Sequence, residues 1–174
     1  MVNGIVPDGR ALVTKGREEA AQYKKMFGVN IPASALADRI ALKCHMNTIY
    51  GSYRPFGSSI LLSCHDNMVG PSLWMIEPSG SCYQYYACAS GRGRQLCRTE
   101  LEKVNFRELT VQQALPRVAK LLLKAQEEMK DKKQEVELSV MCEDTKWVHK
   151  IMDRVTVDQL TAAALAEIEA EEDE

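Results

Sequence analysis

The sequence lacks an excess of charge of either sign. Its 174 residues include 22 Lys and Arg against 24 Asp and Glu, which gives a formal net charge of -2 at pH 7. Nucleic acids and anionic membrane surfaces attract proteins with a strong positive field. We therefore expect neither of them as a partner.

Long apolar runs are also missing. No stretch approaches the ~18 apolar residues that a membrane-spanning helix needs, and the first residues do not form the basic, apolar and small-residue zones of a signal peptide. From these absences the sequence predicts a protein of the cytoplasm and nucleus without a membrane partner.

The six cysteines contain no C-x-x-C pair, so we expect free thiols that pack like small apolar side chains. Two of them precede a histidine, in Cys44-His45 and Cys64-His65. Adjacent side chains point in different directions on a helix or a strand, so neither pair presents both groups to one metal ion or one reaction centre. The sequence therefore predicts no metal site.

A phosphate-binding turn is incomplete. Gly91-Arg92-Gly93 has the first two glycines of a dinucleotide-binding fingerprint, but Leu96 stands where the third would be. A close turn from a strand into a helix explains these residues better than a phosphate cradle does. We expect no cofactor.

Two helices are predicted near the N-terminus. The first follows Pro7, with Asp8 as a candidate cap, and ends at Gly28. The second follows Pro32 and ends near Tyr50. Spacings of three and four predict the inward faces: Val13, Gly16, Ala20, Tyr23 and Phe27 in the first helix, and Leu36, Ala37, Ile40, Ala41, Cys44 and Thr48 in the second.

Beyond Pro55 the pattern changes to short β-rich runs. Turn residues separate three strands, which indicates an antiparallel meander at residues 58–64, 72–76 and 81–89. Helices follow at 93–103 and 111–129, the second with a capping box of Thr110 and Gln113 and an inward face that includes Val111, Leu122 and Ala125. A hairpin at 136–142 and 147–152 and a last helix capped by Thr156 and Gln159 complete the chain.

This alternation of helix pairs and strand groups predicts an α+β fold. The length fits one domain, which we place at residues 1–166, followed by an acidic tail at residues 167–174.

Four ordered motifs give the chain a family resemblance. They are Tyr-Gly-Ser-Tyr-Arg-Pro-Phe-Gly at 50–57, Leu-Trp-Met-Ile-Glu-Pro-Ser-Gly at 73–80, Thr-Glu-Leu-Glu-Lys-Val at 99–104, and Lys130-Asp131-Lys132 leading into Glu137-Leu138-Ser139. Together they resemble the α-type subunits of the proteasome core particle, in particular the alpha type-3 group. The resemblance runs from Gly4 to about Val155.

The resemblance implies a four-layer α-β-β-α sandwich of the N-terminal nucleophile hydrolase type. Family members begin with a gating tail, a ring-surface helix and several strands, so on this basis we expect a chain that lacks the first strands and the N-terminal helix. The implied role is a noncatalytic subunit of the α ring. The implied partners are other α subunits, β subunits and regulatory particles, in ubiquitin-dependent protein degradation.

Two other functions stay open at this stage. A catalytic threonine-type β subunit would need a Thr, Ser or Cys at its mature N-terminus, because the α-amine there acts as the base, and Met1-Val2 offers none. The other alternative is a free-standing interaction fragment. The resemblance assigns no catalytic residue; it places Gly4 and Ile5 at the pocket for activator tails. Structural motif residues are Asp8, Arg10, Tyr50, Arg54, Pro55 and Gly57, with Arg54 expected to tie together carbonyls of neighbouring loops.

Overall fold

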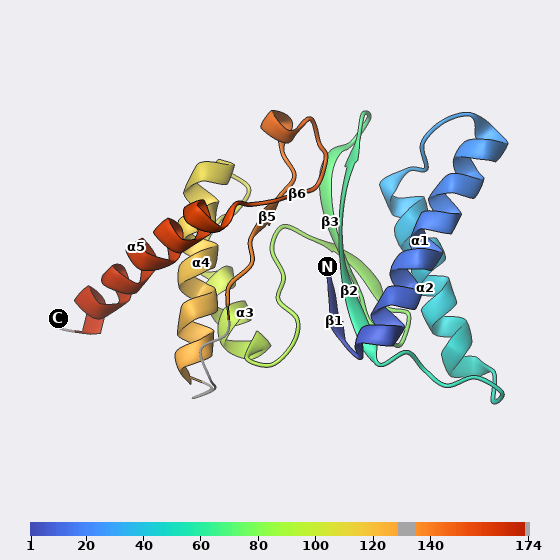
Figure 1. Ribbon diagram of the computed structural model, residues 1–174. Coiled ribbons are helices and arrows are strands. Elements are labelled where there is room, and N and C mark those ends of the chain that lie inside the picture. Colours follow the sequence, from blue (N-terminus) through green and yellow to red (C-terminus); the bar gives the residue numbers. More distant parts are fainter. Residues whose placement is uncertain (129–134, 173–174) are drawn as a thin grey trace. The chain divides into compact units, whose positions relative to one another are not determined.

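The computed structural model describes residues 1–128 and 135–172, and it has the mixed helix and sheet content of an α+β protein (Figure 1). The chain divides into two compact units, Met1–Gly91 and Arg92–Glu174, and each is described by itself. The assignment of one domain to residues 1–166 stays a prediction. Among the described residues, none of the helices is long and apolar enough to cross a membrane.

The first unit is a four-stranded antiparallel sheet with a helical hairpin inserted between its first two strands. The strands pair in chain order, as the predicted meander requires. The elements are β1 (Val2–Gly4), α1 (Val6–Phe27), α2 (Ala33–Ile49), β2 (Ser58–Asp66), β3 (Gly70–Ile76) and β4 (Cys82–Tyr85).

The helical hairpin covers one face of this sheet (Figure 1). Residues paired across antiparallel strands share a face, and one such row contains Val2, Ile60, Ile76 and Cys82. This row packs with Leu12 of α1 and with the small and aliphatic residues of α2, and the cluster is the core of the unit.

The two helices are joined closely to each other. Gly16 is buried in α1, and a Cβ atom there would lie 3.2 Å from Cδ1 of Ile40 in α2. Glu19 of α1 accepts a hydrogen bond of 2.8 Å from Arg39 of α2 and pairs with Lys15 at 2.7 Å. The end of α1 at Gly28, in the left-handed conformation with φ of 73°, is confirmed.

The inward face of α1 differs in part from the prediction. Leu12 is buried, whereas Val13 and Phe27 are 37% and 56% exposed. The helix begins at Val6 with Ile5 as its cap, and Asp8 lies inside the first turn without a capping bond. Its carboxylate is engaged elsewhere, as described below. In α2, the predicted stripe from Ala37 to Cys44 is confirmed, but Thr48, in the last turn of the helix, is exposed.

The second unit contains a helical cluster and a short hairpin. Ala119 and Leu123 of α4 pack with Val157, Ala164 and Ile168 of α5 in its core. The elements are α3 (Arg94–Glu102), α4 (Val111–Glu128), β5 (Ser139–Val140), a 3₁₀ turn η1 (Glu143–Thr145), β6 (Lys150–Ile151) and α5 (Arg154–Glu172).

The start of α4 is confirmed in detail. The Thr110 backbone N–H donates to Oε1 of Gln113 at 3.0 Å, and the Gln113 N–H donates back to the Thr110 hydroxyl at 3.4 Å. The inward face differs in part from the predicted one. Ala125 is buried as predicted, whereas Val111 and Leu122 are 40% and 38% exposed and Ala119 is fully buried.

Other boundaries in the second unit were predicted wrongly. The hairpin strands, predicted at 136–142 and 147–152, are two residues each. The 3₁₀ turn and Lys146 lie in the predicted turn, and Trp147, the first residue of the second predicted strand, has a positive φ. The last helix is capped by Asp153, which accepts from the Thr156 N–H at 3.1 Å, so the helix begins before the predicted box of Thr156 and Gln159. It continues through Glu172, and the expected tail from Glu167 onward is helical as far as that residue.

We expect Ile76→Ala to destabilise the first unit by about 2–5 kcal/mol, because it removes a fully buried side chain and leaves a cavity. Urea unfolding measures the change. Met68, which is 92% exposed, supplies the control: Met68→Ala should stay within about 0.5 kcal/mol of the parent. Equal losses for the two variants would contradict this core.

Candidate functional site

Three of the predicted motif residues meet at the point where the start of α1 lies beside the loop that leads from α2 into β2. The central contact is an ion pair between Asp8 and Arg54. Nη1 and Nη2 of Arg54 donate to Oδ2 and Oδ1 of Asp8, both at 2.7 Å. The Gly57 backbone N–H adds a third bond to Oδ2 at 2.9 Å. We call these three residues the clasp.

The Asp8 carboxylate is buried, with 6% of the residue exposed. Hydrogen bonds from the Arg54 guanidinium, followed by the Gly57 N–H, lower the pKa of Asp8 from 3.8 to about 2. The same contact raises the pKa of Arg54. All three hydrogen bonds favour the ionised carboxylate, so Asp8 holds two chain segments together and is not suited to accept a proton during a reaction.

The role predicted for Arg54 is corrected in one respect. Its main partner is the carboxylate of Asp8, which matches the guanidinium in shape and charge, and not the carbonyls of neighbouring loops. Within the part of the chain that the structure describes, the one carbonyl that its guanidinium reaches is that of Pro55, at 3.1 Å. The Arg54 carbonyl in turn accepts from the Asn47 side chain at 3.2 Å, which ties the loop to α2.

Backbone contacts around the clasp require two glycines. The Ile5 N–H donates to the Gly57 carbonyl at 2.9 Å, and the Ser58 hydroxyl donates to the Ile5 carbonyl at 2.7 Å. Gly4 has a φ of 121°, and a Cβ atom there would lie 2.2 Å from the Gly57 oxygen. A Cβ atom on Gly57 would lie 2.5 Å from Cδ1 of Ile5. At these two positions the chain segments therefore approach each other more closely than a residue with a side chain would allow.

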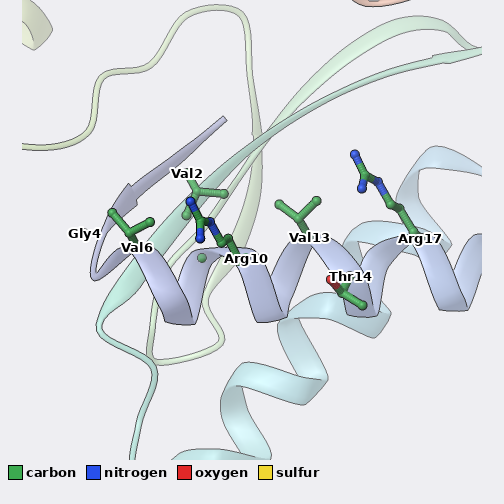
Figure 2. A pocket seen from close by; sticks show the side chains of 8 residues that line it. Val2, Gly4, Val6, Arg10, Val13, Thr14 and Arg17 are labelled. Carbon is green, nitrogen blue, oxygen red and sulfur yellow. The ribbon is translucent and has the colours of Figure 1, made fainter.

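The remaining motif residues lie outside the clasp. Tyr50 is the C-cap residue that follows α2 and is 51% exposed. Pro55 is exposed in the loop. Arg10 is exposed on α1, and together with Gly4 it lines a hollow of about 470 Å³ between β1 and α1, whose other lining residues are Val2, Val6, Gly9, Val13, Thr14 and Arg17 (Figure 2). The assignment of Gly4 and Ile5 to an activator-tail pocket stays a prediction.

Sequence reasoning missed some polar residues near the site. Ser58 is 2% exposed, and its hydroxyl fixes the cap of α1. Asn3 donates to Ser90 at 3.3 Å, and the Ser90 and Ser59 hydroxyls lie 2.7 Å apart. A single sequence does not show whether the hydroxyl of a serine at the start of a strand is buried or exposed to solvent.

The prediction of no metal site was based on the Cys-His pairs. Cys44 is buried and His45 exposed, as expected for a packed thiol beside a surface imidazole. Burial raises the pKa of the Cys44 thiol. Within residues 1–128 and 135–172, no group of three or more His, Cys, Asp or Glu is arranged to hold a metal ion.

Comparison with known proteins identifies the family. The family described as proteasome subunit matches residues 1–141. This chain belongs to the proteasome subunit family. The four motifs that carried the resemblance therefore indicated the family correctly, although Lys130–Lys132 lie outside the described residues.

Several relatives share the name proteasome subunit alpha type-3. The one from Acanthamoeba castellanii is 38% identical over 172 residues, which is 99% of this chain and 68% of the relative. That from Dictyostelium discoideum is 40% identical over 97% of this chain and 67% of the relative. That from Arabidopsis thaliana is 40% identical over 98% of this chain and 69% of the relative. The similarity to alpha type-3 subunits thus covers nearly the whole chain.

The clasp should make stability depend on pH in a defined window. The folded-state pKa of Asp8 is lowered, so its contribution is present above its ordinary pKa of 3.8 and is lost as the pH falls towards about 2. We expect the stability advantage of the parent over Asp8→Asn to be constant above about pH 5 and to vanish near pH 2. Urea midpoints from pH 6 to 2 measure it.

The exposed Asp144 supplies the control for that titration, because Asp144→Asn should leave the acid limb of the curve unchanged. An advantage over Asp8→Asn that stays constant down to pH 2 would show that the ion pair does not stabilise the fold.

We expect Gly4→Ala to cost at least about 2 kcal/mol, since it adds a clash with the Gly57 carbonyl to an unfavourable φ. Gly51→Ala is the matched control: a Cβ atom there meets nothing within 4 Å, and the change should stay within about 1 kcal/mol. Thermal unfolding of both variants tests the close approach, and a Gly4→Ala protein as stable as Gly51→Ala would refute it.

Proposed function

We propose that this protein is a noncatalytic structural subunit of the proteasome core α ring, which supports ring assembly, substrate gating and regulator docking in ubiquitin-dependent protein degradation. The observation that carries the proposal is the similarity to alpha type-3 subunits over 97–99% of the chain. The clasp supports it, because the motif residues Asp8, Arg54 and Gly57 are used to hold the fold and not to react.

A catalytic role is disfavoured because no suitable position is found at which cleavage of the chain could expose an N-terminal nucleophile. Proteases of this type need a Thr, Ser or Cys with a free α-amine. Ser58 after Gly57 is buried, and its hydroxyl is bonded to the Ile5 carbonyl. Cleavage before Ser52 or Ser81 would separate elements that share the core of the first unit. A threonine-type β subunit is therefore the weaker alternative.

We further infer that the first unit is half of a four-layer α-β-β-α sandwich. The sheet face opposite the helices carries two cross-strand rows, Leu61–Met75–Tyr83 and Ser63–Leu73–Tyr85. Most of these side chains are apolar, and Tyr83 is 64% exposed. A sheet that is apolar on both faces needs a cover on both, and a second sheet supplies one in the proposed sandwich.

The partners in this proposal are neighbouring α subunits, a β subunit and regulatory particles. We propose the cytoplasm and the nucleus as its location, which is the location that the sequence predicts. Imaging of the fluorescently tagged protein tests that location, and exclusive signal in a membrane-bounded compartment would contradict it.

Native mass spectrometry tests the assembly. We expect the chain, coexpressed with the neighbouring α subunits, to be recovered in complexes with them, and Ile76→Ala to reduce the yield because it loosens the fold. The purified chain should show no turnover of fluorogenic peptides. A chain that stays alone beside assembled neighbours would favour a free-standing interaction fragment, and turnover blocked by a threonine-directed covalent inhibitor would favour the catalytic alternative.

A further inference from the structure

The sequence contains a single Asn-Gly pair, Asn3-Gly4. Asparagine before glycine is the pair at which a protein chain most readily loses a side-chain amide, because glycine has no side chain to keep its backbone nitrogen away from the preceding Cγ. The pair lies in β1, the strand that pairs with β2 and precedes the clasp. A covalent change there would affect both the sheet and the start of α1.

The Asn3 side chain is held by the loop that follows β4. Its amide nitrogen Nδ2 donates to the Ser90 hydroxyl at 3.3 Å, and that hydroxyl lies 2.7 Å from the Ser59 hydroxyl. A Cβ atom on Gly91 would lie 2.9 Å from Nδ2 and 3.3 Å from Cγ of Asn3. The amide group is therefore both hydrogen-bonded to this loop and packed against it, so the direction in which Cγ points is fixed.

The backbone nitrogen of Gly4 is held by the strand pairing. The antiparallel register places Asn3 opposite Ser59. The next residue, Ile5, donates to the Gly57 carbonyl at 2.9 Å, and a Cβ atom on Gly4 would lie 2.2 Å from that carbonyl oxygen. Because a peptide group is planar, its nitrogen reaches the Asn3 Cγ only by rotation about the Asn3 Cα–C bond. That rotation would break the register of β1, so the folded unit keeps the two reacting atoms apart.

We propose that Asn3 is a deamidation site that the folded first unit keeps closed and that opens when β1 leaves the sheet. In the open chain the Gly4 nitrogen attacks Cγ of Asn3 and forms a C–N bond, while the bond from Cγ to Nδ2 breaks. The amide leaves as ammonia and takes the proton of the Gly4 N–H, which leaves a cyclic succinimide. Water then opens the ring at either carbonyl, so the products are aspartate and isoaspartate at position 3. No atom is oxidised or reduced.

The isoaspartate product cannot regain the pairing of β1. In isoaspartate the main chain runs through Cβ and Cγ, so it is longer by one carbon atom. The register of an antiparallel pair is specified at every residue, and β1 is held on both sides of position 3, by Val2 in the core row and by Gly4 against Gly57. The added atom displaces one of these two contacts. A chain that stays open long enough to react therefore loses the ability to close.

Peptide mapping of the full chain tests whether the fold closes the site. The tryptic peptide 1–10 contains one side-chain amide, that of Asn3, so its conversion is read from the mass gained when an amide becomes a carboxylate. The isolated peptide 1–10, which has no fold, supplies the reference rate in each solvent. At mildly alkaline pH we expect the full chain to react at least about tenfold more slowly in buffer than in guanidinium chloride, because the reaction proceeds through the open state. Equal rates in the two solvents, relative to the peptide, would overturn the protection.

Removal of the Ser90 hydroxyl should open the site in buffer. Ser90→Ala leaves the Asn3 amide without its acceptor, and we expect deamidation at least about threefold faster than in the parent. Ser34→Ala, which removes an exposed hydroxyl in the first turn of α2, should react at the parent rate. Equal rates in the two variants would overturn the part assigned to the contact with Ser90.

Refolding separates the longer main chain from the new charge. Chains converted in denaturant are returned to buffer, and amide exchange is followed at Leu61, whose N–H donates to the Met1 carbonyl at 2.9 Å. We expect this amide to be protected in Asn3→Asp, which has the charge with a normal main chain. It should also be protected in Asn3→Gln after the same treatment, because the longer side chain does not close the succinimide ring. In the isoaspartate fraction, exchange should be at least about tenfold faster. Protection in that fraction, or its loss in either variant, would overturn the role of the added main-chain atom.

Discussion

The contact between Asp8 and Arg54 is the constraint on which the first unit depends. Strands β1 and β2 are neighbours in the sheet, yet the chain between Gly4 and Ser58 contains both long helices. Closing such a connection costs conformational entropy, and the two ends must be fixed to bring the strands into register. Arg54 and Gly57, just before β2, bind Asp8, just after β1. One buried carboxylate therefore joins the first turn of α1 to the segment that enters β2.

The position of the Asp8 carboxylate explains why only part of the clasp could be predicted from the sequence. Arg-Pro-Phe-Gly could be predicted as a structural junction, because its residue types restrict the backbone and offer donors. Asp8 after Pro7 fits a helix cap equally well from sequence alone. A partner 46 residues away decided the matter, and long-range pairing is not visible in local patterns. The family resemblance placed both residues in one motif set without stating their contact.

The same limit explains the errors in the helix faces. Periodicity predicted the elements and the end of α1 at Gly28, which depends on local backbone geometry. It did not predict that Leu12, and not Val13, faces the sheet, because both positions fit a helical stripe and the neighbouring element decides between them. In the hairpin after α4, Cys142 forms local bonds with the Thr145 hydroxyl, and the paired strands are shorter than predicted. Short strands have few cross-strand bonds with which to resist such turns.

The clasp also determines how the elements of the first unit lie relative to one another. Gly4 lies against Gly57, and Asp8 ties the first turn of α1 to the loop that enters β2. The α-subunit fold proposed for this chain uses its motif residues for such positioning. Structural residues without reactive chemistry can therefore determine function, because they set where the binding groups of two elements lie relative to each other.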